Sequence, residues 1–541
     1  MSKILLSASH IAKFYGDRQI LAFEQLHVRE GDKIGIVGAN GAGKTTLLGI
    51  LSGEISPDEG TITREVPVTY FRQFRERAAA VDPQAARQLG LAGKLERENL
   101  SGGEATRLGL AEMKPDALLT FADEPTANLD AEGIELCVER LQACPTLLLV
   151  SHDRSVLDRL CNRIIEVRDG KLFFYRGNYT AFRTQREQTL ERQKFEFAQY
   201  QSEKARLEAA IREKGQASRS VRKAPKRMGN SEARLHKREA VESSEKLDNA
   251  KKSLISRLEH LEVKEKPHET APVKIDFGLT DPPANRDIVT GNRLSFRYGD
   301  HVIFENAAFC LPKGSKTALI GPNGSGKTTL MELIATDAPG IRIVPKARIG
   351  YFRQNLSLID LNKTALENVM ETAVQTEKTM RGILARLLIR RDDVYKKAGV
   401  LSGGERVKLA FAKLFGSPAN LLLLDEPTNF LDMPAIEALQ QMICEYEGTV
   451  LFVSHDRNFS DACATRILRI EQKKLTAFDG NLSAWEAQQA KPRKNPQQMD
   501  KALLELRLAE VISRLSAPNC PDKEQLEAEF QQLLLKKKEM E

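Results

Sequence analysis

The chain has 541 residues, of which 41% are hydrophobic and 29% are charged, so it can bury several ordinary globular cores. Its net charge of +7 is too small to establish a nucleic-acid partner, and its seven cysteines are scattered without a C-x-x-C pair, which argues against a zinc site or a disulfide framework. No apolar run approaches the roughly 18 residues that span a bilayer, and the N-terminal sequence lacks the apolar core of a signal peptide. We therefore expect a soluble cytoplasmic protein without a membrane partner.

The sequence GANGAGKTT, which begins at Gly38, follows the apolar run IGIV and fits the phosphate-loop pattern G-x-x-x-x-G-K-[ST]. In such a loop, backbone N–H groups and the start of the following helix face the phosphates of a nucleotide. Lys44 is placed to contact the β- and γ-phosphates, and the Thr45 hydroxyl to ligate Mg²⁺. The residues predicted to bind nucleotide here are Gly38, Asn40, Gly41, Gly43, Lys44, Thr45 and Thr46.

Four further motifs follow this loop: YFRQ at 70–73, LSGGE at 100–104, DEPTANLD at 123–130 and SHDR at 151–154. Asp123 ends an apolar strand, where a carboxylate can hold Mg²⁺, and Glu124 can orient or deprotonate the attacking water. Gln73 is a candidate sensor of the metal and the γ-phosphate, and His152 a candidate contact of the γ-phosphate. A single Asp-Glu pair is usually a solvated turn, but its fixed place after a phosphate loop favours the catalytic interpretation.

The second half of the chain repeats these motifs in the same order: GPNGSGKTT from 321, YFRQ at 351–354, LSGGE at 401–405, DEPTNFLD at 425–432 and SHDR at 454–457. The corresponding site residues are Gly321, Asn323, Gly324, Gly326, Lys327, Thr328, Thr329, Gln354, Asp425, Glu426 and His455, with Thr328, Gln354 and Asp425 as metal candidates. The repeat predicts two tandem α/β domains, 1–182 and 287–490, each with a mainly parallel sheet flanked by helices. The first copy has Ala127 where the second has Asn429, which puts equal hydrolysis rates in doubt.

Apolar residues at helical spacing occupy both ends of the linker 183–286. They are Leu190, Phe197, Tyr200, Leu207 and Ile211, then Leu247, Leu254, Leu258 and Leu261. We expect two antiparallel helices with a basic tip near 214–231, since residues 212–240 contain ten Lys/Arg against three Glu. The tip is either a solvated coiled-coil end or an RNA contact, and its sign bias, with Pro225 and Gly229, favours RNA. The candidate RNA-binding residues are Arg219, Arg222, Lys223, Lys226 and Arg227.

The C-terminal segment 491–541 has apolar residues at helical spacing on both sides of a short stretch between Pro518 and Pro521. This pattern predicts a short helical extension that ends in three lysines at 536–538. A solvated extension and a second RNA contact explain it equally well.

The LSGGE sequences, the phosphate loops, the DEPT segments and the SHD sequences together resemble the ATP-binding-cassette (ABC) ATPases over most of both copies. In that family two cassettes pair head to tail. The resemblance implies that Ser101, Gly102 and Gly103 close over the ATP held by the second loop, and Ser402, Gly403 and Gly404 over the ATP held by the first. It also implies that Tyr15 and Tyr298 stack on adenine.

The form DEPTNFLD resembles the DEPTNHLD sequence of the ABC-F subfamily, whose soluble twin-cassette members act on ribosomes, more than the DEPTSALD usual in transporters. This resemblance implies an ATP hydrolase whose linker enters the ribosomal tRNA exit site and meets 23S rRNA and the peptidyl tRNA. Ser101 follows Gln73 by 28 residues, whereas Ser402 follows Gln354 by 48. The first cassette therefore lacks room for the arm that housekeeping members insert there.

The missing arm and the long linker resemble the antibiotic-resistance members of the Vga and Vml types, which protect the ribosome against lincosamides, streptogramin A and pleuromutilins. Two alternatives stay open: a general ABC-F translation factor, and the ATPase subunit of a drug exporter whose membrane helices come from a partner chain. Because two cassettes occur in one chain, we expect a monomer that uses ATP and Mg²⁺.

Overall fold

The computed structural model describes residues 3–72, 102–112, 117–127, 129–221, 230–264, 283–353 and 358–490, together with 507, 508, 511, 528 and 530–533. The chain forms two compact units. The first contains the N-terminal cassette, the linker helices and the residues 352–418 and 428–442 of the second cassette. The second contains the sheets of the second cassette, from residues 279–351, 419–427 and the segment after 442. No helix in the described ranges combines the length and apolar character needed to cross a bilayer.

Two sheets form the first cassette. A three-stranded antiparallel sheet has the order β2-β1-β4, and a six-stranded sheet, parallel except at β9, has the order β5-β6-β7-β3-β8-β9. The strands are β1 Ile4–Tyr15, β2 Arg18–Arg29, β3 Lys33–Val37, β4 Glu59–Arg64, β5 Val68–Phe71, β6 Leu119–Asp123, β7 Leu147–Val150, β8 Arg163–Arg168 and β9 Lys171–Arg176. Since β3, β7 and β6 are parallel neighbours, the loops after them meet at one edge of the sheet.

Helices cover the parallel sheet of this cassette and enclose two apolar clusters. They are α1 Lys44–Ser52, α3 Gly102–Glu112, α4 Ala131–Ala143 and α5 Arg154–Leu160. One cluster lies around α1 and includes Leu47 and Ile36, and the other lies around α4 and α5 and includes Leu141 and Leu157. Strands β6 and β7 are buried at every position, as expected for parallel strands between layers of helices. The predicted α/β fold with a mainly parallel sheet is confirmed for this cassette.

The second cassette repeats this topology. Its antiparallel sheet has the order β11-β10-β13, and its six-stranded sheet the order β14-β15-β16-β12-β17-β18. The strands are β10 Asp287–Tyr298, β11 His301–Pro312, β12 Lys316–Ile320, β13 Ile341–Ile343, β14 Ile349–Phe352, β15 Leu421–Asp425, β16 Thr449–Val453, β17 Arg466–Glu471 and β18 Lys474–Asp479. The helices are α8 Lys327–Ala335, α9 Ala365–Met370, α10 Glu377–Arg386, α11 Gly403–Gly416, α12 Met433–Glu445, α13 Arg457–Cys463 and α14 Leu482–Ala490. The prediction of two tandem cassettes is therefore confirmed.

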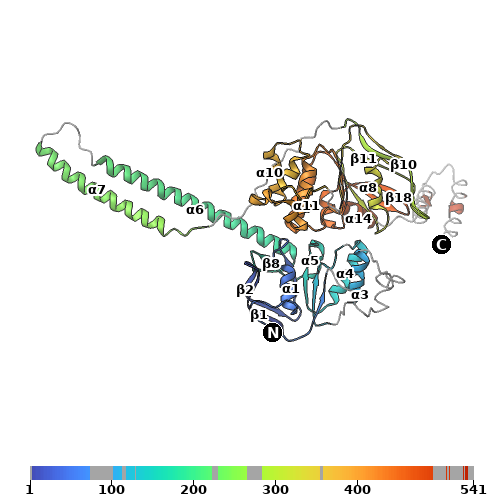
Figure 1. Ribbon diagram of the computed structural model, residues 1–541, viewed down its shortest axis with the longest axis horizontal. Helices are drawn as coiled ribbons and strands as arrows, with labels where there is room; N and C mark the ends of the chain where they lie inside the picture. Colours follow the sequence, from blue (N-terminus) through green and yellow to red (C-terminus); the bar gives the residue numbers. More distant parts are fainter. Residues whose placement is uncertain are drawn as a thin grey trace, which may run out of the picture. The chain divides into compact units, whose positions relative to one another are not determined.

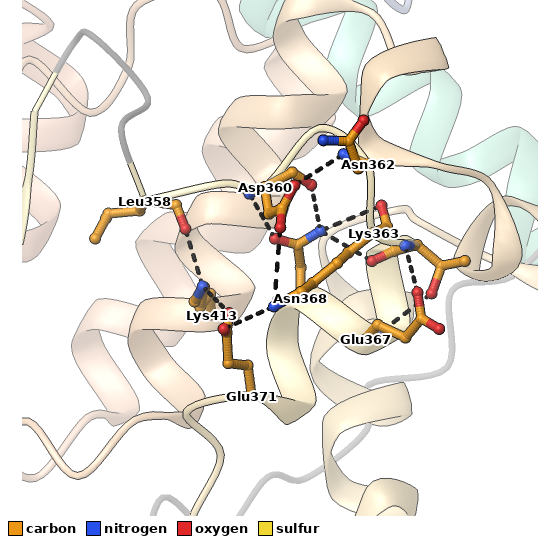
Figure 2. A network of polar contacts seen from close by, with 9 residues as sticks. Leu358, Asp360, Asn362, Lys363, Glu367, Asn368, Glu371 and Lys413 are labelled. Carbon is orange, nitrogen blue, oxygen red and sulfur yellow. Dashed lines mark hydrogen bonds and ion pairs between the residues drawn. The ribbon is translucent and has the colours of Figure 1, made fainter.

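The extra residues of the second cassette, between YFRQ and LSGGE, form a small helical region held by polar contacts (Figure 2). Asn368 of α9 is fully buried, and its amide accepts from the Asp360 N–H at 2.9 Å and donates to the carbonyls of Asp360, Lys363 and Thr364. Glu371 then pairs with Lys363 at 2.8 Å and with Lys413 of α11 at 2.9 Å. These contacts connect the inserted residues to the helix that begins in the LSGGE motif.

The linker forms the two antiparallel helices that the apolar spacing predicts, α6 Tyr179–Val221 and α7 Asn230–Glu259, which lie side by side (Figure 1). At 1.5 Å per residue, α6 is about 65 Å long. Leu207 is buried, and the other predicted stripe residues of α6 and α7 are half-buried, while most of the positions between them are exposed. Near the far end, the buried Ser218 hydroxyl donates to Asp248 at 2.8 Å, which fixes the register of the two helices. Residues 222–229 of the tip and most of 491–541 lie outside the described residues.

Candidate nucleotide-binding sites

The first phosphate loop connects β3 to α1 and carries three left-handed glycines. Gly38, Gly41 and Gly43 have φ of 155°, 75° and 101°. A side chain at Gly38 would place its Cβ 2.4 Å from the carbonyl oxygen of Val167, so only glycine fits there. Gly43 provides no side-chain cap for α1, which leaves the first N–H groups of the helix available to an anion.

Lys44 begins α1 and is almost fully buried, with its Nζ folded back on the loop. It donates to the carbonyls of Gly38 and Ala39 at 2.9 and 3.0 Å. Burial lowers its pKa, while Glu124, Asp432 and Asp123 oppose that shift. A buried ammonium group at the start of the helix, held by loop carbonyls and near carboxylates, is suited to bind the phosphate oxygens of a nucleotide.

The second loop has the same construction between β12 and α8. Gly324 and Gly326 are left-handed, with φ of 77° and 100°. Lys327 Nζ donates to the carbonyls of Gly321 and Pro322 at 2.8 and 3.0 Å. The Ser325 hydroxyl is buried without a hydrogen-bond partner, as expected of a group that faces a phosphate.

In each cassette the threonine after the loop lysine lies beside the aspartate that ends a central strand. Thr328 donates to Asp425 at 2.9 Å, and Thr45 is hydrogen-bonded to Asp123. Burial raises the pKa of both aspartates, and these hydrogen bonds oppose the rise. A hydroxyl and one carboxylate side by side suit Mg²⁺, which in nucleotide sites takes few protein ligands and completes its shell with phosphate and water. The residues therefore fit the metal that the fold family implies.

Glu124 follows Asp123 directly and has a strained backbone with φ of 48°. Its Oε2 accepts from the His152 backbone N–H at 3.3 Å, and the His152 ring nitrogen Nε2 lies 3.4 Å from its Oε1. That second contact does not satisfy Oε1, which is buried without a hydrogen-bond partner. A water beside the phosphates could be bound by this oxygen.

The second cassette reproduces this arrangement. Glu426 has φ of 50° and is 9% exposed, and its Oε1 lies 3.2 Å from His455 Nε2. The two segments thus share the positive φ at the glutamate and the Glu–His contact, although Ala127 and Asn429 differ between them. The structure brings together the loop lysine, threonine, aspartate, glutamate and histidine that the sequence selected within each cassette.

The electrostatics of the two glutamates depend on burial. Burial and the adjacent aspartate raise the pKa of Glu124 and of Glu426 to about 8. Burial and Lys44 lower the pKa of His152 to about 3, so this histidine is neutral at pH 7. Without nucleotide, both glutamates carry a proton over much of the range below pH 8.

This gives a pH-dependence prediction for the nucleotide-free protein. Folded glutamates with pKa near 8, against about 4.3 when unfolded, bind extra protons, so their contribution to stability is lost as pH rises from about 5 to 8. Replacing both with Gln should raise the free energy of unfolding relative to wild type progressively over this range, on the order of 1 kcal/mol per pH unit for each site. Thermal unfolding at pH 5, 6, 7 and 8 measures this difference. The exposed Glu132→Gln should show no such trend, and a pH-independent difference for the double variant would contradict the assignment.

The LSGGE segment of the second cassette lies against the first phosphate loop, and both belong to the first compact unit. Ser402 caps α11: its hydroxyl accepts from the Glu405 backbone N–H at 3.3 Å. In return, the Glu405 carboxylate accepts from the Ser402 backbone N–H. A Cβ at Gly404 would lie 2.8 Å from the Phe430 carbonyl and 3.0 Å from Asn40 Nδ2, so glycine permits this close approach. Gly403 meets nothing within 4 Å on the side where a Cβ would project. The start of α11 is therefore placed beside the nucleotide loop of the other cassette.

Asp432, the last residue of DEPTNFLD, is a site residue that the sequence analysis missed. Its Oδ2 accepts from the Asn40 N–H at 3.1 Å, and its Oδ1 lies 3.2 Å from Lys408 of α11. The Asn40 side chain also donates to the Phe430 carbonyl at 2.9 Å. Asp432 thereby joins the phosphate loop to the LSGGE helix. The sequence did contain a clue, because both DEPT segments end in an aspartate, Asp130 in the first copy and Asp432 in the second. In the structure Asp130 likewise pairs with a cation of its LSGGE helix, Arg107 of α3, at 2.6 Å.

The predicted adenine contacts are exposed aromatic rings at strand ends. Tyr15 ends β1 and Tyr298 ends β10, and they are 53% and 54% exposed. Of the signature residues of the first cassette, Gly102 and Gly103 begin α3. Arg219 is exposed in the last turn of α6. The predicted residues Gln73, Ser101, Gln354, Arg222, Lys223, Lys226 and Arg227 lie outside the described residues.

Each cassette has a nucleotide loop on a mainly parallel sheet and a Glu–His pair beside it, and the second LSGGE helix lies against the first loop. Together these features define a twin-cassette ATPase. The family model described as ABC transporter matches residues 24–89 and 304–429. "ABC transporter F family member 2" of Arabidopsis thaliana is 30% identical over 87% of this chain and 77% of its own length. The chain belongs to the F family of ABC proteins, as its DEPTNFLD form indicated, and it is an ATP hydrolase of the ABC type.

Other relatives extend the similarity. The "Ribosome protection protein VmlR" of Bacillus subtilis is 28% identical over 100% of this chain and 99% of its own length. The "Erythromycin resistance ATP-binding protein MsrA" of Staphylococcus epidermidis is 32% identical over 82% of this chain and 93% of its own length. Among solved structures, "RNase-L Inhibitor" superposes with a TM-score of 0.60 at 21% identity, covering 89% of this chain and 92% of that one, which shows a shared fold.

Proposed function

We propose that this chain is a ribosome-associated ATPase whose linker hairpin enters the tRNA exit site and protects the ribosome from antibiotics of the peptidyl transferase centre. ATP binding at both loops holds the cassettes closed, and hydrolysis releases the protein from the ribosome. The name of VmlR, a ribosome protection protein aligned over essentially its whole length, supports the ribosome as the partner. Action on ribosomes also supports a cytoplasmic location.

At each site the residues have distinct proposed roles. Lys44 and Lys327 bind the phosphates, and Tyr15 and Tyr298 stack on adenine. Mg²⁺, when bound, neutralises phosphate charge, and the threonine–aspartate pairs Thr45–Asp123 and Thr328–Asp425 hold it. Gln73 and Gln354 complete this set of ligands.

The hydrolytic step is assigned to the glutamate and histidine of each site. Glu124 and Glu426, in their deprotonated form, orient the attacking water and accept its proton at Oε1, the oxygen of Glu124 that is buried without a partner. His152, neutral at pH 7, donates a hydrogen bond toward the γ-phosphate, and His455 does the same in the second cassette. The glycines and serines of both LSGGE segments close over the nucleotide of the opposite loop.

The observation that carries the proposal is the direct connection between the first ATP site and the hairpin. Helix α5 begins two residues after His152, and its Asp158 accepts from the Thr180 N–H and hydroxyl of α6, both at 2.7 Å. Tyr179 and Phe182 bury the start of α6 in the cassette core. The same helix then runs unbroken to Val221, so its last residues belong to the basic tip near 214–231. A rearrangement at the ATP site can thus move α6, and the motion of this continuous helix carries the tip with it.

The basic tip, with Arg219, Arg222, Lys223, Lys226 and Arg227, is the proposed contact for 23S rRNA and peptidyl tRNA. The proposed drugs are lincosamides, streptogramin A and pleuromutilins, as the Vga and Vml resemblance implies. The name of MsrA carries resistance to erythromycin, so that drug belongs in any test of range.

In-vitro translation without membranes tests the function. The purified chain with ATP should restore synthesis inhibited by a lincosamide, streptogramin A or a pleuromutilin, with erythromycin assayed in parallel. A Lys44→Ala/Lys327→Ala variant is the matched control and should give no rescue. A drug exporter predicts no rescue without membranes, and a general translation factor predicts equal stimulation with and without drug; either result would overturn the proposal.

A further inference from the structure

The second cassette contains a cavity of about 390 Å³ whose lining includes two cysteines and no residue of the nucleotide motifs. Cys444 lies in the last turn of α12 and is exposed at the surface, and Cys463 ends α13 and is 2% exposed. Their thiols are hydrogen-bonded to each other, and Cys444 Sγ also donates to the Ala462 carbonyl at 3.6 Å. An exposed thiol is thus paired with a buried one across two helices.

A buried lysine also lines this cavity. Lys316 of β12 is 6% exposed, and its Nζ donates to the carbonyls of Tyr446 and Gly448. Its charge favours a thiolate at Cys444, and the hydrogen bond from Cys463 does so more strongly; together they lower the pKa of Cys444 to about 7. The charged groups around the pair are Lys316 from β12, Glu445 at the end of α12, Glu447 two residues after it, and Asp456 at the start of α13.

We propose that Cys444 and Cys463 form a peroxide-reactive dithiol site that oxidises reversibly to an intramolecular disulfide between α12 and α13. Nothing in the nucleotide chemistry uses these thiols. Reactive thiols are recognised by an accessible sulfur, a nearby cation and a resolving cysteine within contact, and this cavity has all three. The other described cysteines of the chain lack that combination, since Cys137, Cys144 and Cys161 are buried and Cys310 has no cysteine against it.

The chemistry needs hydrogen peroxide as the oxidant and proceeds in two steps. The Cys444 thiolate attacks one peroxide oxygen, an S–O bond forms, the O–O bond breaks, and the released hydroxide takes a proton to become water. The Cys463 sulfur then attacks Cys444 sulfur, an S–S bond forms, the S–O bond breaks, and a second water leaves with the Cys463 proton. In sum, two thiols and one peroxide give one disulfide and two waters.

Peptide mapping of the full-length protein tests this site. Reduced wild type treated with one equivalent of hydrogen peroxide should yield a Cys444–Cys463 linked peptide that disappears with dithiothreitol. The Cys463→Ser variant should stop at a Cys444 sulfenic acid that dimedone traps, and Cys444→Ser should form neither product. Circular dichroism verifies that the variants are folded. The linked peptide of the wild-type protein tests the proposal even if a variant fails to fold.

The pH profile of alkylation provides an independent measurement. Cys444 in wild type should react with iodoacetamide at pH 7 roughly 10-fold faster than a free cysteine of pKa about 8.5, with a midpoint near pH 7. Cys137, fully buried, is the internal control and should stay unlabelled. The proposal is overturned if Cys444 and Cys463 remain reduced while other cysteines oxidise, or if Cys444 pairs with a cysteine other than Cys463.

Discussion

The Glu124→Gln/Glu426→Gln double variant should hydrolyse ATP about 100-fold or more slowly than wild type and remain bound to ribosomes in the presence of ATP. The expectation follows from geometry, because each glutamate lies beside a phosphate loop, next to the aspartate of the Thr–Asp pair and against a histidine. Removing a general base costs roughly 10²- to 10⁴-fold in rate. Glutamine keeps the size and most hydrogen bonds of glutamate, so nucleotide binding should persist and closed cassettes should not reopen.

ATPase rates and co-sedimentation with ribosomes measure the two parts of this result. Lys44→Ala/Lys327→Ala is the matched control, since it removes the buried cation of each loop and should neither hydrolyse ATP nor stay on the ribosome. A double glutamine variant that binds ATP but fails to co-sediment would remove the ribosome from the proposed function. One that co-sediments while hydrolysing at the wild-type rate would remove both glutamates from the proposed mechanism.

The single glutamine variants address the difference between the sites. The two Glu–His pairs have the same backbone conformation, with φ of 48° and 50°, and similar contacts. The local surroundings differ, because Ala127 replaces Asn429 and its carbonyl accepts from Thr106 of α3 at 3.0 Å. The backbone conformation at the glutamate and its histidine contact are therefore shared, and the segment after the glutamate is a place where the two sites differ.

The sequence was sufficient to predict the two cassettes and the hairpin, because both depend on local patterns. Each phosphate loop is encoded by glycines that must adopt positive φ, and the hairpin by leucines at helical spacing. The contact between Asn40 and Asp432 could not be predicted in this way, since it joins residues 392 positions apart. Motif spacing also gives no information on burial, which sets the pKa of Glu124 near 8 and that of His152 near 3.

The same limit applies to the cavity beside Lys316. Cys444 and Cys463 are separated in sequence by a strand and most of a helix, and the scattered cysteine spacing argued only against zinc and structural disulfides. Their proximity arises because α12 and α13 end near each other beside β12. Side-chain pairs of this kind follow from the packing of elements, so they become visible only when the topology is known.

Replacing residues 222–230 with a short Gly/Ser turn should abolish drug rescue in membrane-free translation while leaving ATP binding and hydrolysis in the absence of ribosomes unchanged. The reason is separation along the chain: α6, which leads from the first cassette to Val221, is about 65 Å long, so its far end lies well away from the first nucleotide loop. The hairpin itself should persist, because the Leu207 packing and the Ser218–Asp248 hydrogen bond, which fix its register, lie outside the replaced residues.

A matched control separates the position of the charge from its amount. Arg192 and Arg206 are exposed at 81% and 77% on the middle of α6, and changing them with Lys204 to Gln removes three positive charges without touching the tip. If rescue depends on a basic tip that meets RNA, this triple variant should keep rescue, while Arg222→Gln/Lys223→Gln/Lys226→Gln should lose it and bind ribosomes with a weaker salt dependence. Equal loss in both variants would mean that the whole hairpin attracts polyanions, and that the tip has no special contact.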